Sequence, residues 1–343
     1  MPLTNFPNGI TSFGVPVLGG VGGLPLTGTY WFVDPASGAD GNIGTTPEFP
    51  FKTLYRAVQK AADGNNDVIV LIGNGQSTGS ARLSTELAQT IDPTVTTGTL
   101  NWNKNALHLI GVAAPTKVGG RARIAPPTGT YTASTFGSNA FVNVTGAGCV
   151  FMNIDVFCGF STGANGMIAW TESGGRNYYN NVNIQGMGDA ASAGGANSRT
   201  LKITAGENTF AGCTLGLDTV TRSAANATVE FASGTARNTF EDCIFPFQTS
   251  AATPLGILAS AASAMDRWQL FSRCSFINNV ASTSTTMSAL GTLPASAGGL
   301  ILFKDATLVG ITEFGSDANS LGQMYVDGGT PTAATTGIAV NPS

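Results

Sequence analysis

A motif that recurs about every thirty residues constrains the fold of this chain more than any other feature. The pattern aromatic-x-x-(small or apolar)-x-apolar occurs six times, at nearly even spacing between residues 151 and 308. A fixed period of this length is typical of a solenoid, in which each repeat forms one turn and stacks on its neighbours. The copies are FMNIDV from Phe151, YNNVNI from Tyr179, FAGCTL from Phe210, FEDCIF from Phe240, FSRCSF from Phe271 and FKDATL from Phe303.

A second apolar segment precedes most copies and alternates with period two: FVNV at 141, LKIT at 201 and TVEF at 228. Two or three short strands in each turn of about thirty residues predict a mainly β fold, a single-stranded parallel β-helix. Six rungs at ~4.8 Å each would make a coil of roughly 29 Å. The segment LHLIGV at 107–112 would add a rung below.

The composition excludes several classes of protein. Charged residues make up 10% of the 343 residues, against roughly 25% in ordinary domains. The net charge is -4 and no run of Lys or Arg occurs, so we expect no nucleic-acid partner. The longest apolar runs are too short to span a membrane, so we expect no membrane partner. Five cysteines in a chain this long do not make a disulfide framework and are typical of a reducing cytosol.

The fourth position of the motif places three cysteines one rung apart, which would allow metal binding or a disulfide. The other copies carry Ile, Val or Ala there, and a position that accepts all four types is typical of inward packing. We therefore expect a core stack and no metal site, and the same holds for Cys149 and Cys158. The six residues are Ile154, Val182, Cys213, Cys243, Cys274 and Ala306.

We call the fourth position of the motif the packing slot. The third position, directly before it, is expected to lie at a corner of the coil, where Asn, Gly and Asp tolerate unusual backbone angles. Asp242, Arg273 and Asp305 could form a short external ion ladder there, which would contribute little stability. The residues at this position are Asn153, Asn181, Gly212, Asp242, Arg273 and Asp305.

Catalytic patterns are hard to find. His108 is the only histidine, which excludes mechanisms that need a His pair, and no Ser-His-Asp or zinc set can be assembled. Glycoside hydrolysis needs two carboxylates at a fixed separation. Few of the acidic residues occupy the same position in different repeats, so the sequence predicts no such pair. Asp34 and Asp40 could hold a calcium ion, but turn chemistry explains them equally well. We therefore predict no catalytic residue, no metal, no cofactor and no enzymatic activity.

Residues 30–75 read as a strand (YWFV), a long Gly/Asp loop, an amphipathic helix (FKTLYRAVQKAA) and a buried strand (VIVLIG). This order and wording resemble the entry segment of pectin-lyase-like right-handed parallel β-helix proteins. The resemblance implies a right-handed coil whose open end is capped by the helix. That fold hosts lyases, hydrolases, tailspikes and structural proteins, so the resemblance indicates no particular activity.

Residues 1–28 carry no charged side chain, and Pro7, Pro16 and Pro25 interrupt every apolar run. Such a segment fits neither a secretory signal nor a helix or central strand. We expect an extended arm with apolar anchors that must lie on another surface.

The arm NFPNGITSFGVPV, followed by a Gly-rich link and WFVDP, resembles the start of a group of tailed-bacteriophage virion proteins, and the match spans the arm and the β-helix entry. The resemblance implies a head decoration or cement protein that forms a homotrimer, docks on the major capsid protein and is assembled in the bacterial host cytoplasm into the virion. The expected docking residues are Phe6, Pro7, Phe13, Val15 and Pro16; alternatively, these residues pack on the protein's own first rungs.

The sequence thus divides into an arm (1–28), a β-helix entry with its capping helix (29–75), the parallel β-helix (76–315) and a C-terminal strap or tail (316–343). The alternative function is that of a trimeric tailspike or fibre that binds or cleaves host surface polysaccharide. A secreted adhesin is a third possibility, weakened by the lack of a signal peptide.

Overall fold

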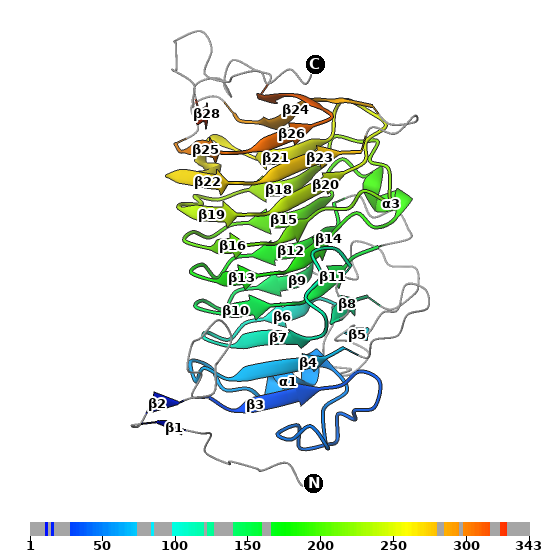
Figure 1. The fold of residues 1–343 in the computed structure, drawn as a ribbon, viewed down its shortest axis with the longest axis vertical. Coiled ribbons are helices and arrows are strands. Elements are labelled where there is room, and N and C mark those ends of the chain that lie inside the picture. Colours follow the sequence, from blue (N-terminus) through cyan, green and yellow to red (C-terminus); the bar gives the residue numbers. More distant parts are fainter. Residues whose placement is uncertain are drawn as a thin grey trace.

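The chain forms a right-handed parallel β-helix, which confirms the predicted fold class. The computed structural model describes residues 11–12, 15–16, 28–73, 84–85, 98–119, 122–126, 140–159, 166–279, 285–294, 298–315 and 323–327. Between residues 68 and 315, each turn of the coil adds one strand to each of three parallel sheets (Figure 1). Segments one repeat apart in sequence therefore lie side by side along the coil.

The ten-stranded sheet contains β3 (Tyr30–Val33), β4 (Val68–Ile72), β7 (His108–Val112), β10 (Val150–Met152), β13 (Tyr178–Asn180), β16 (Thr209–Ala211), β19 (Asn238–Glu241), β22 (Trp268–Ser272), β25 (Leu300–Lys304) and β28 (Met324–Val326). The strand β28 falls within 316–343, so part of the segment expected to be a strap or tail adds a strand to the coil by pairing with β25.

The β5–β26 sheet contains β5 (Ser84–Thr85), β8 (Arg123–Ala125), β11 (Asp155–Phe157), β14 (Asn183–Gln185), β17 (Thr214–Leu215), β20 (Ile244–Phe247), β23 (Ser275–Asn278) and β26 (Thr307–Val309). The β6–β27 sheet contains β6 (Leu100–Trp102), β9 (Ala140–Val144), β12 (Ile168–Glu172), β15 (Arg199–Ile203), β18 (Ala227–Phe231), β21 (Leu255–Ala259), β24 (Met287–Thr292) and β27 (Ile311–Gly315). The second strands predicted at 141, 201 and 228 are confirmed as parts of β9, β15 and β18.

An aromatic stack runs through the core along the ten-stranded sheet. It is formed by the first residue of each copy of the motif, and every ring is at most 2% exposed. Successive ring centroids lie 4.4 to 5.4 Å apart, and most neighbouring rings are within 8° of parallel. Contacts of this kind add stabilisation beyond the burial of apolar area. The members are Phe151, Tyr179, Phe210, Phe240, Phe271 and Phe303.

The packing slot and the corner of the motif are both as predicted. The three cysteines of the slot are buried, and each thiol contacts the carbonyl oxygen of the aromatic residue one rung below, such as Cys243 Sγ to Phe210 O at 3.3 Å. All six corner residues have positive φ, between 50° and 60°. Asn, Gly and Asp adopt this left-handed conformation readily, whereas it strains the backbone of Arg273.

A ladder of buried side-chain amides runs beside the aromatic stack, just before the strands of the ten-stranded sheet. Asn208 Oδ1 accepts from the backbone N–H of Asn177 at 3.0 Å, and Asn238 Oδ1 accepts from that of Asn208 at 3.0 Å. Gln269 continues the ladder by accepting from the side chain of Asn238 at 2.9 Å. These bonds satisfy backbone donors inside the coil that would otherwise be costly to bury.

The predicted capping helix is confirmed as α1 (Leu54–Lys60) at the base of the coil (Figure 1). The side chain of Thr53 caps its N-terminus by accepting from Arg56 N. The helix buries its apolar face in the core, as the spacing of Phe51, Leu54, Val58 and Ala61 predicts. Shorter helical segments are α3 (Ala190–Ala193) and the 3-10 helix η3 (Ala262–Ala264). None of the described helices is long and apolar enough to cross a membrane.

Candidate functional site

The predicted docking arm is described only in part. The strands β1 (Thr11–Ser12) and β2 (Val15–Pro16) pair antiparallel, with Thr11 opposite Pro16 and Ser12 opposite Val15. They make a two-stranded sheet of their own, separate from the three sheets of the coil. Val15 and Pro16 thus lie in a short hairpin, whereas Phe6, Pro7 and Phe13 lie outside the described residues. Docking through this arm stays a prediction.

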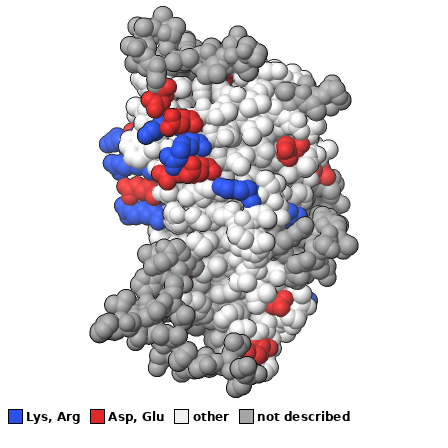
Figure 2. All heavy atoms as spheres, viewed as in Figure 1, with Lys and Arg blue, Asp and Glu red and all other residues white. Residues whose placement is uncertain are grey.

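Several exposed charged residues of the coil gather beside the ten-stranded sheet. Figure 2 shows Lys, Arg, Asp and Glu in one strip near the left edge of this face, over the upper rungs. In the turns that lead into this sheet, Glu207 accepts from Arg176 Nε at 2.7 Å and from Arg237 Nη1 at 3.0 Å. These hydrogen bonds and charges hold the pKa of Glu207 below its ordinary value. Because all three side chains are well exposed, the strip is a solvated ion network and does not resemble a catalytic set.

The predicted corner ladder is present in part. Arg273 donates to Asp242 through Nε at 2.8 Å and Nη2 at 3.0 Å, a bidentate pair one rung apart. Among the described residues no ion pair links Arg273 to Asp305, which is one rung further along the coil. The ladder is therefore shorter than expected.

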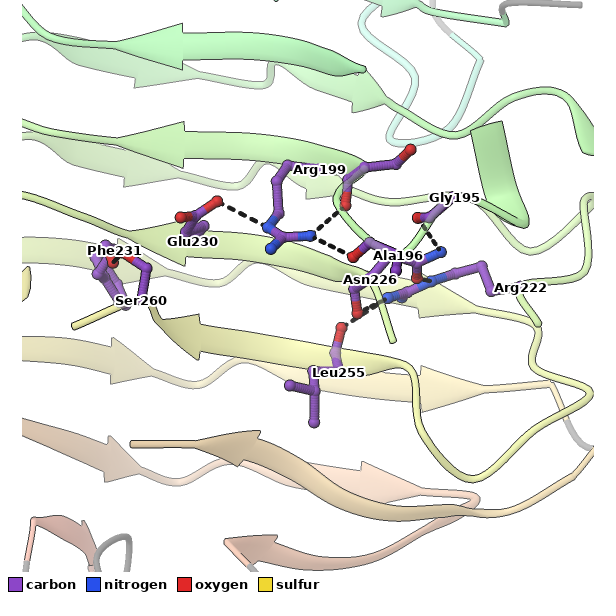
Figure 3. A network of polar contacts seen from close by, with 10 residues as sticks. Gly195, Ala196, Arg199, Arg222, Asn226, Glu230, Phe231, Leu255 and Ser260 are labelled. Atoms are coloured by element: carbon purple, nitrogen blue, oxygen red, sulfur yellow. Dashed lines mark hydrogen bonds and ion pairs between the residues drawn. The ribbon is translucent and has the colours of Figure 1, made fainter. Parts of the chain in front are cut away.

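A buried polar network lies beside α3, at the edge of the β6–β27 sheet (Figure 3). Arg199 Nε pairs with Glu230 Oε2 at 2.7 Å. The guanidinium of Arg222 has no carboxylate partner in the described part of the chain; it donates to Asn226 Oδ1 at 2.6 Å and to the carbonyl of Leu255 at 2.8 Å. Burial, together with the charge of Arg199, lowers the pKa of Arg222 to about 9. This network holds loops onto the coil, and its groups are engaged with one another.

A second buried set lies on the β5–β26 sheet, on three successive rungs. The carboxylate of Asp155 accepts from Arg123 Nε at 2.5 Å and from Gln185 Nε2 at 2.9 Å, and Asp155 is completely buried. The Arg123 guanidinium also lies 5.6 Å from the ring centroid of Phe157. A carboxylate, a guanidinium and an amide are groups that can position a polar substrate, but here they are engaged with each other.

A third buried acid, Glu172, stands at the end of β12. Its oxygens accept from the backbone N–H groups of Gly174 and Gly175 at 2.9 Å, from the amide of Asn177 and from the hydroxyl of Tyr179. Burial raises the pKa of Glu172 despite these hydrogen bonds. The carboxyl joins the amide ladder to the aromatic stack and has a structural role.

A hollow of about 600 Å³, here called the base groove, lies between α1 and β6 at the base of the coil. Lys104 crosses from the β6 side and donates to the carbonyl oxygens of Gln59, at 3.1 Å, and Ala61, which satisfies the C-terminal end of α1. Burial lowers the pKa of Lys104. The polar residues that line the groove include Tyr55, Arg56, Lys60, Asn101, Asn103 and Lys104.

The remaining candidates from the sequence have local roles. His108 is buried, and its Nδ1 accepts from Val150 N at 3.1 Å, while burial lowers its pKa.

Asp34 accepts from Ala36 N and from the backbone and hydroxyl of Ser37. Asp34 thus organises its own turn, whereas Asp40 accepts from the backbone of Lys52 and Thr53 and so ties the loop to the start of α1. In the part of the chain that is described, no group of three or more His, Cys, Asp or Glu side chains is arranged to hold a metal ion.

Sequence reasoning missed the buried polar sets, although a signal existed for some of them. Arg123, Asp155 and Gln185 follow one another at the period of the repeat. Asn208 and Asn238 each begin the tripeptide NTF and are likewise one period apart. The base groove has no such signal, because its two walls come from separate segments that carry no common motif.

Comparison with known proteins finds similarity to solved structures only. No family model and no curated protein matches the sequence. Among solved structures, a pectin methylesterase from Aspergillus niger is 14% identical, with a TM-score of 0.48 and coverage of 89% of this chain and 88% of that chain. A rhamnogalacturonan lyase is 14% identical, with a TM-score of 0.43 and coverage of 82% and 74%. The pectin methylesterase PemA from Erwinia chrysanthemi is 14% identical, with a TM-score of 0.41 and coverage of 86% and 77%.

These neighbours correct one prediction. The sequence patterns predict that the chain is not an enzyme, but the solved structures named above, which share this fold, are enzymes. The physical reason is that a coil brings together side chains from successive rungs, so a polar set needs no contiguous motif, as Arg123, Asp155 and Gln185 illustrate. The likeness does not transfer an activity to this chain, and the prediction that it is not an enzyme is withdrawn.

Proposed function

We propose that this protein is a structural component of a bacteriophage virion, a head decoration or cement protein that docks on the major capsid protein through its N-terminal arm. In this proposal it acts as a homotrimer and joins the virion in the cytoplasm of the bacterial host. The observation that carries the proposal is the separation of the arm from the coil: β1 and β2 pair with each other and belong to none of the sheets of the coil. An uncharged, Pro- and Gly-rich segment of this kind is suited to ordering on a partner.

The coil itself supports the same proposal. Its aromatic stack and amide ladder run through successive rungs, which gives a rigid body suited to bearing load between neighbouring capsid subunits. The low charge of the chain favours close packing of subunits, since few charges would have to be desolvated at an interface. The resemblance of the arm and the β-helix entry to phage virion proteins points in the same direction.

The test is co-sedimentation of the purified protein with phage heads that lack it, comparing the full chain with a form that lacks residues 2–28. We expect the full chain to bind stoichiometrically and to raise the melting temperature of the heads, and the shortened form to do neither. The shortened form keeps Thr29, whose backbone N–H bonds to Asp67, so its own melting curve should match that of the full chain. Binding by both forms would contradict docking through the arm.

One surface favours a second candidate, the binding of host polysaccharide. The outer face of the ten-stranded sheet carries the partly exposed rings of Tyr178 and Trp268. Near its C-terminal end, a shallow groove of about 400 Å³ is lined by residues that include Leu302, Lys304 and Tyr325. Aromatic rings beside polar groups suit sugar rings. Two results together would favour this function over decoration. The native protein would be retained on host polysaccharide but the Trp268→Ala variant would not, and the protein would not bind phage heads.

A further inference from the structure

The base groove is lined by hydrogen-bond donors and lies at the N-terminal end of the coil, where the arm joins it. The strand β3, which follows the arm, and the helix α1 both lie at the base (Figure 1). They are held together by Asp67, which accepts from Thr29 N at 2.7 Å and from Ala62 N at 2.8 Å, just after α1. Any partner that binds the arm where it joins the coil is therefore brought close to the base groove.

The lining of the base groove is cationic in an acidic protein. It contains Arg56, Lys60 and Lys104, three of the sixteen basic residues, and no carboxylate. Lys104 is engaged with α1, but Lys60 has no ion pair or side-chain hydrogen bond in the described part of the chain. Arg56 uses Nε to bond the carbonyl of Asp40 at 3.2 Å, which leaves its Nη groups available to a ligand.

The opposite wall adds neutral donors. Asn101 lies in β6 and Asn103 directly follows that strand. The side-chain oxygen of Asn101 accepts from Asn143 Nδ2 at 3.2 Å, so the N–H groups of Asn101 remain available. The acidic residues at this end of the coil do not line the groove. Asp40, Asp63 and Asp67 use their oxygens on neighbouring N–H groups. The groove thus presents mainly donors and favours a ligand that presents acceptors with negative charge.

The size of the groove narrows the class of ligand. A volume of about 600 Å³ is enough to hold a few side chains. Its lining includes one aromatic residue, Tyr55, so the groove offers a single ring face for stacking on sugars. Both points favour carboxylate side chains over an acidic polysaccharide.

We propose that the base groove binds Asp and Glu side chains on an acidic surface of the protein to which the arm docks. This inference rests on the proposed function for the identity of that protein, but the chemistry of the groove can be tested without it. Arg56 and Lys60 make the contacts to the carboxylates, and the two asparagines orient them. Contacts of this type weaken with added salt, because the charges lie near solvent.

The first experiment measures binding of a fluorescent hexaglutamate peptide to the full chain by anisotropy, at low and at high salt concentration. We expect saturable binding at low salt that weakens at least fivefold in Lys60→Gln and further in the double variant Arg56→Gln/Lys60→Gln. Lys52→Gln is the matched control, because it removes one exposed charge at the same end of the coil but outside the groove. The melting temperature of each variant shows whether it is folded.

Three results would overturn the inference: no binding of hexaglutamate to the native chain, an equal loss in Lys52→Gln, or binding of hexagalacturonate through Lys60 without binding of hexaglutamate. The last result would assign the groove to an acidic polysaccharide.

The second experiment repeats the head sedimentation with the groove variants. If hexaglutamate binds as expected while no form of the protein binds heads, the proposed function fails and the groove stands as an acidic-protein site. If the full chain binds heads and the groove variants bind them as tightly at every salt concentration, the groove inference fails and docking through the arm stands.

Discussion

The indole Nε1–H of Trp31 donates to the carboxylate of Asp67 across 3.0 Å, joining the first strand of the coil to the turn that follows the capping helix. The same carboxylate accepts from Thr29 N, Ala62 N and Asn65 Nδ2. One buried side chain thus fixes the first strand, the end of the capping helix and the residue that follows the arm. The cap is therefore held by polar contacts as well as by its apolar face.

Replacement of this acid should loosen the cap. In Asp67→Asn, an amide NH₂ takes the place of one oxygen and faces the N–H groups of Trp31 or Thr29, so at least one buried donor loses its acceptor. We expect a loss of roughly 1–3 kcal/mol in the free energy of unfolding at pH 7, measured by urea denaturation. Asp63→Asn, at an exposed acid of the same turn, is the control and should lose less.

The same pair predicts a dependence on pH. Burial opposes ionisation of Asp67, but the four hydrogen bonds outweigh it and lower its pKa. A lowered folded pKa means that the stability is present above the ordinary value, about 3.9, and is lost as the pH falls through the folded value. The native chain and Asp67→Asn should therefore differ at neutral pH and converge in acid. A constant difference at every pH would contradict the shift.

Glu172 should show the opposite trend. Its folded pKa is raised by burial, so its stabilising form is the protonated one, present below the ordinary pKa and lost as the pH rises through the raised value. We expect Glu172→Gln to gain stability relative to the native chain as the pH rises from about 4 to 8. Unfolding curves at several pH values test this. Glu48→Gln, at an exposed glutamate, is the matched control.

The aromatic stack should carry much of the stability of the middle rungs. Phe240 is fully buried, with ring centroids 4.7 Å from Phe210 and 4.5 Å from Phe271. We expect Phe240→Ala to cost about 3–5 kcal/mol and Phe240→Leu to cost less, because leucine fills more of the cavity. Phe49→Ala, at a ring that is 57% exposed, should change stability little. An equal effect at both sites would show that the stack adds nothing.

The cysteines should be inert in the folded chain. All five are free and buried, and burial raises the pKa of Cys149 to about 12. Because the thiolate is the reactive form, a disulfide reagent such as DTNB should label none of them within minutes under native conditions. It should label all five in guanidinium. Ser260→Cys, at an exposed position, should react at once and serve as the positive control.

The coil was predictable from sequence because its determinants repeat. The aromatic position, the packing slot and the left-handed corner each recur about every thirty residues. Once these positions are assigned in one repeat, the same assignment holds for the others and predicts the stacked rungs. Asn153 and Asp242 are corner residues by the same reasoning, and both have the expected positive φ. The entry helix followed from its own apolar spacing.

The polar sites were not predictable to the same degree. Arg222 and Asn226 meet in a loop that varies from turn to turn, so no period marks them. The base groove depends on how α1 lies against β6, and that contact is set by packing at the end of the coil, where the repeat has not yet begun. The sequence shows that the arm is uncharged and apolar. The surface that it binds belongs to another molecule, so this chain alone does not identify it.

The register of the aromatic stack makes the length of this protein adjustable. Phe210 pairs with Phe240 and Phe240 with Phe271 in parallel alignment, so each rung offers its neighbour the same surface that it receives. A segment of one full period can therefore be duplicated or removed without changing the two ends. A variant of this chain with one turn more or one turn fewer should therefore keep the same base and differ only in the length of the coil.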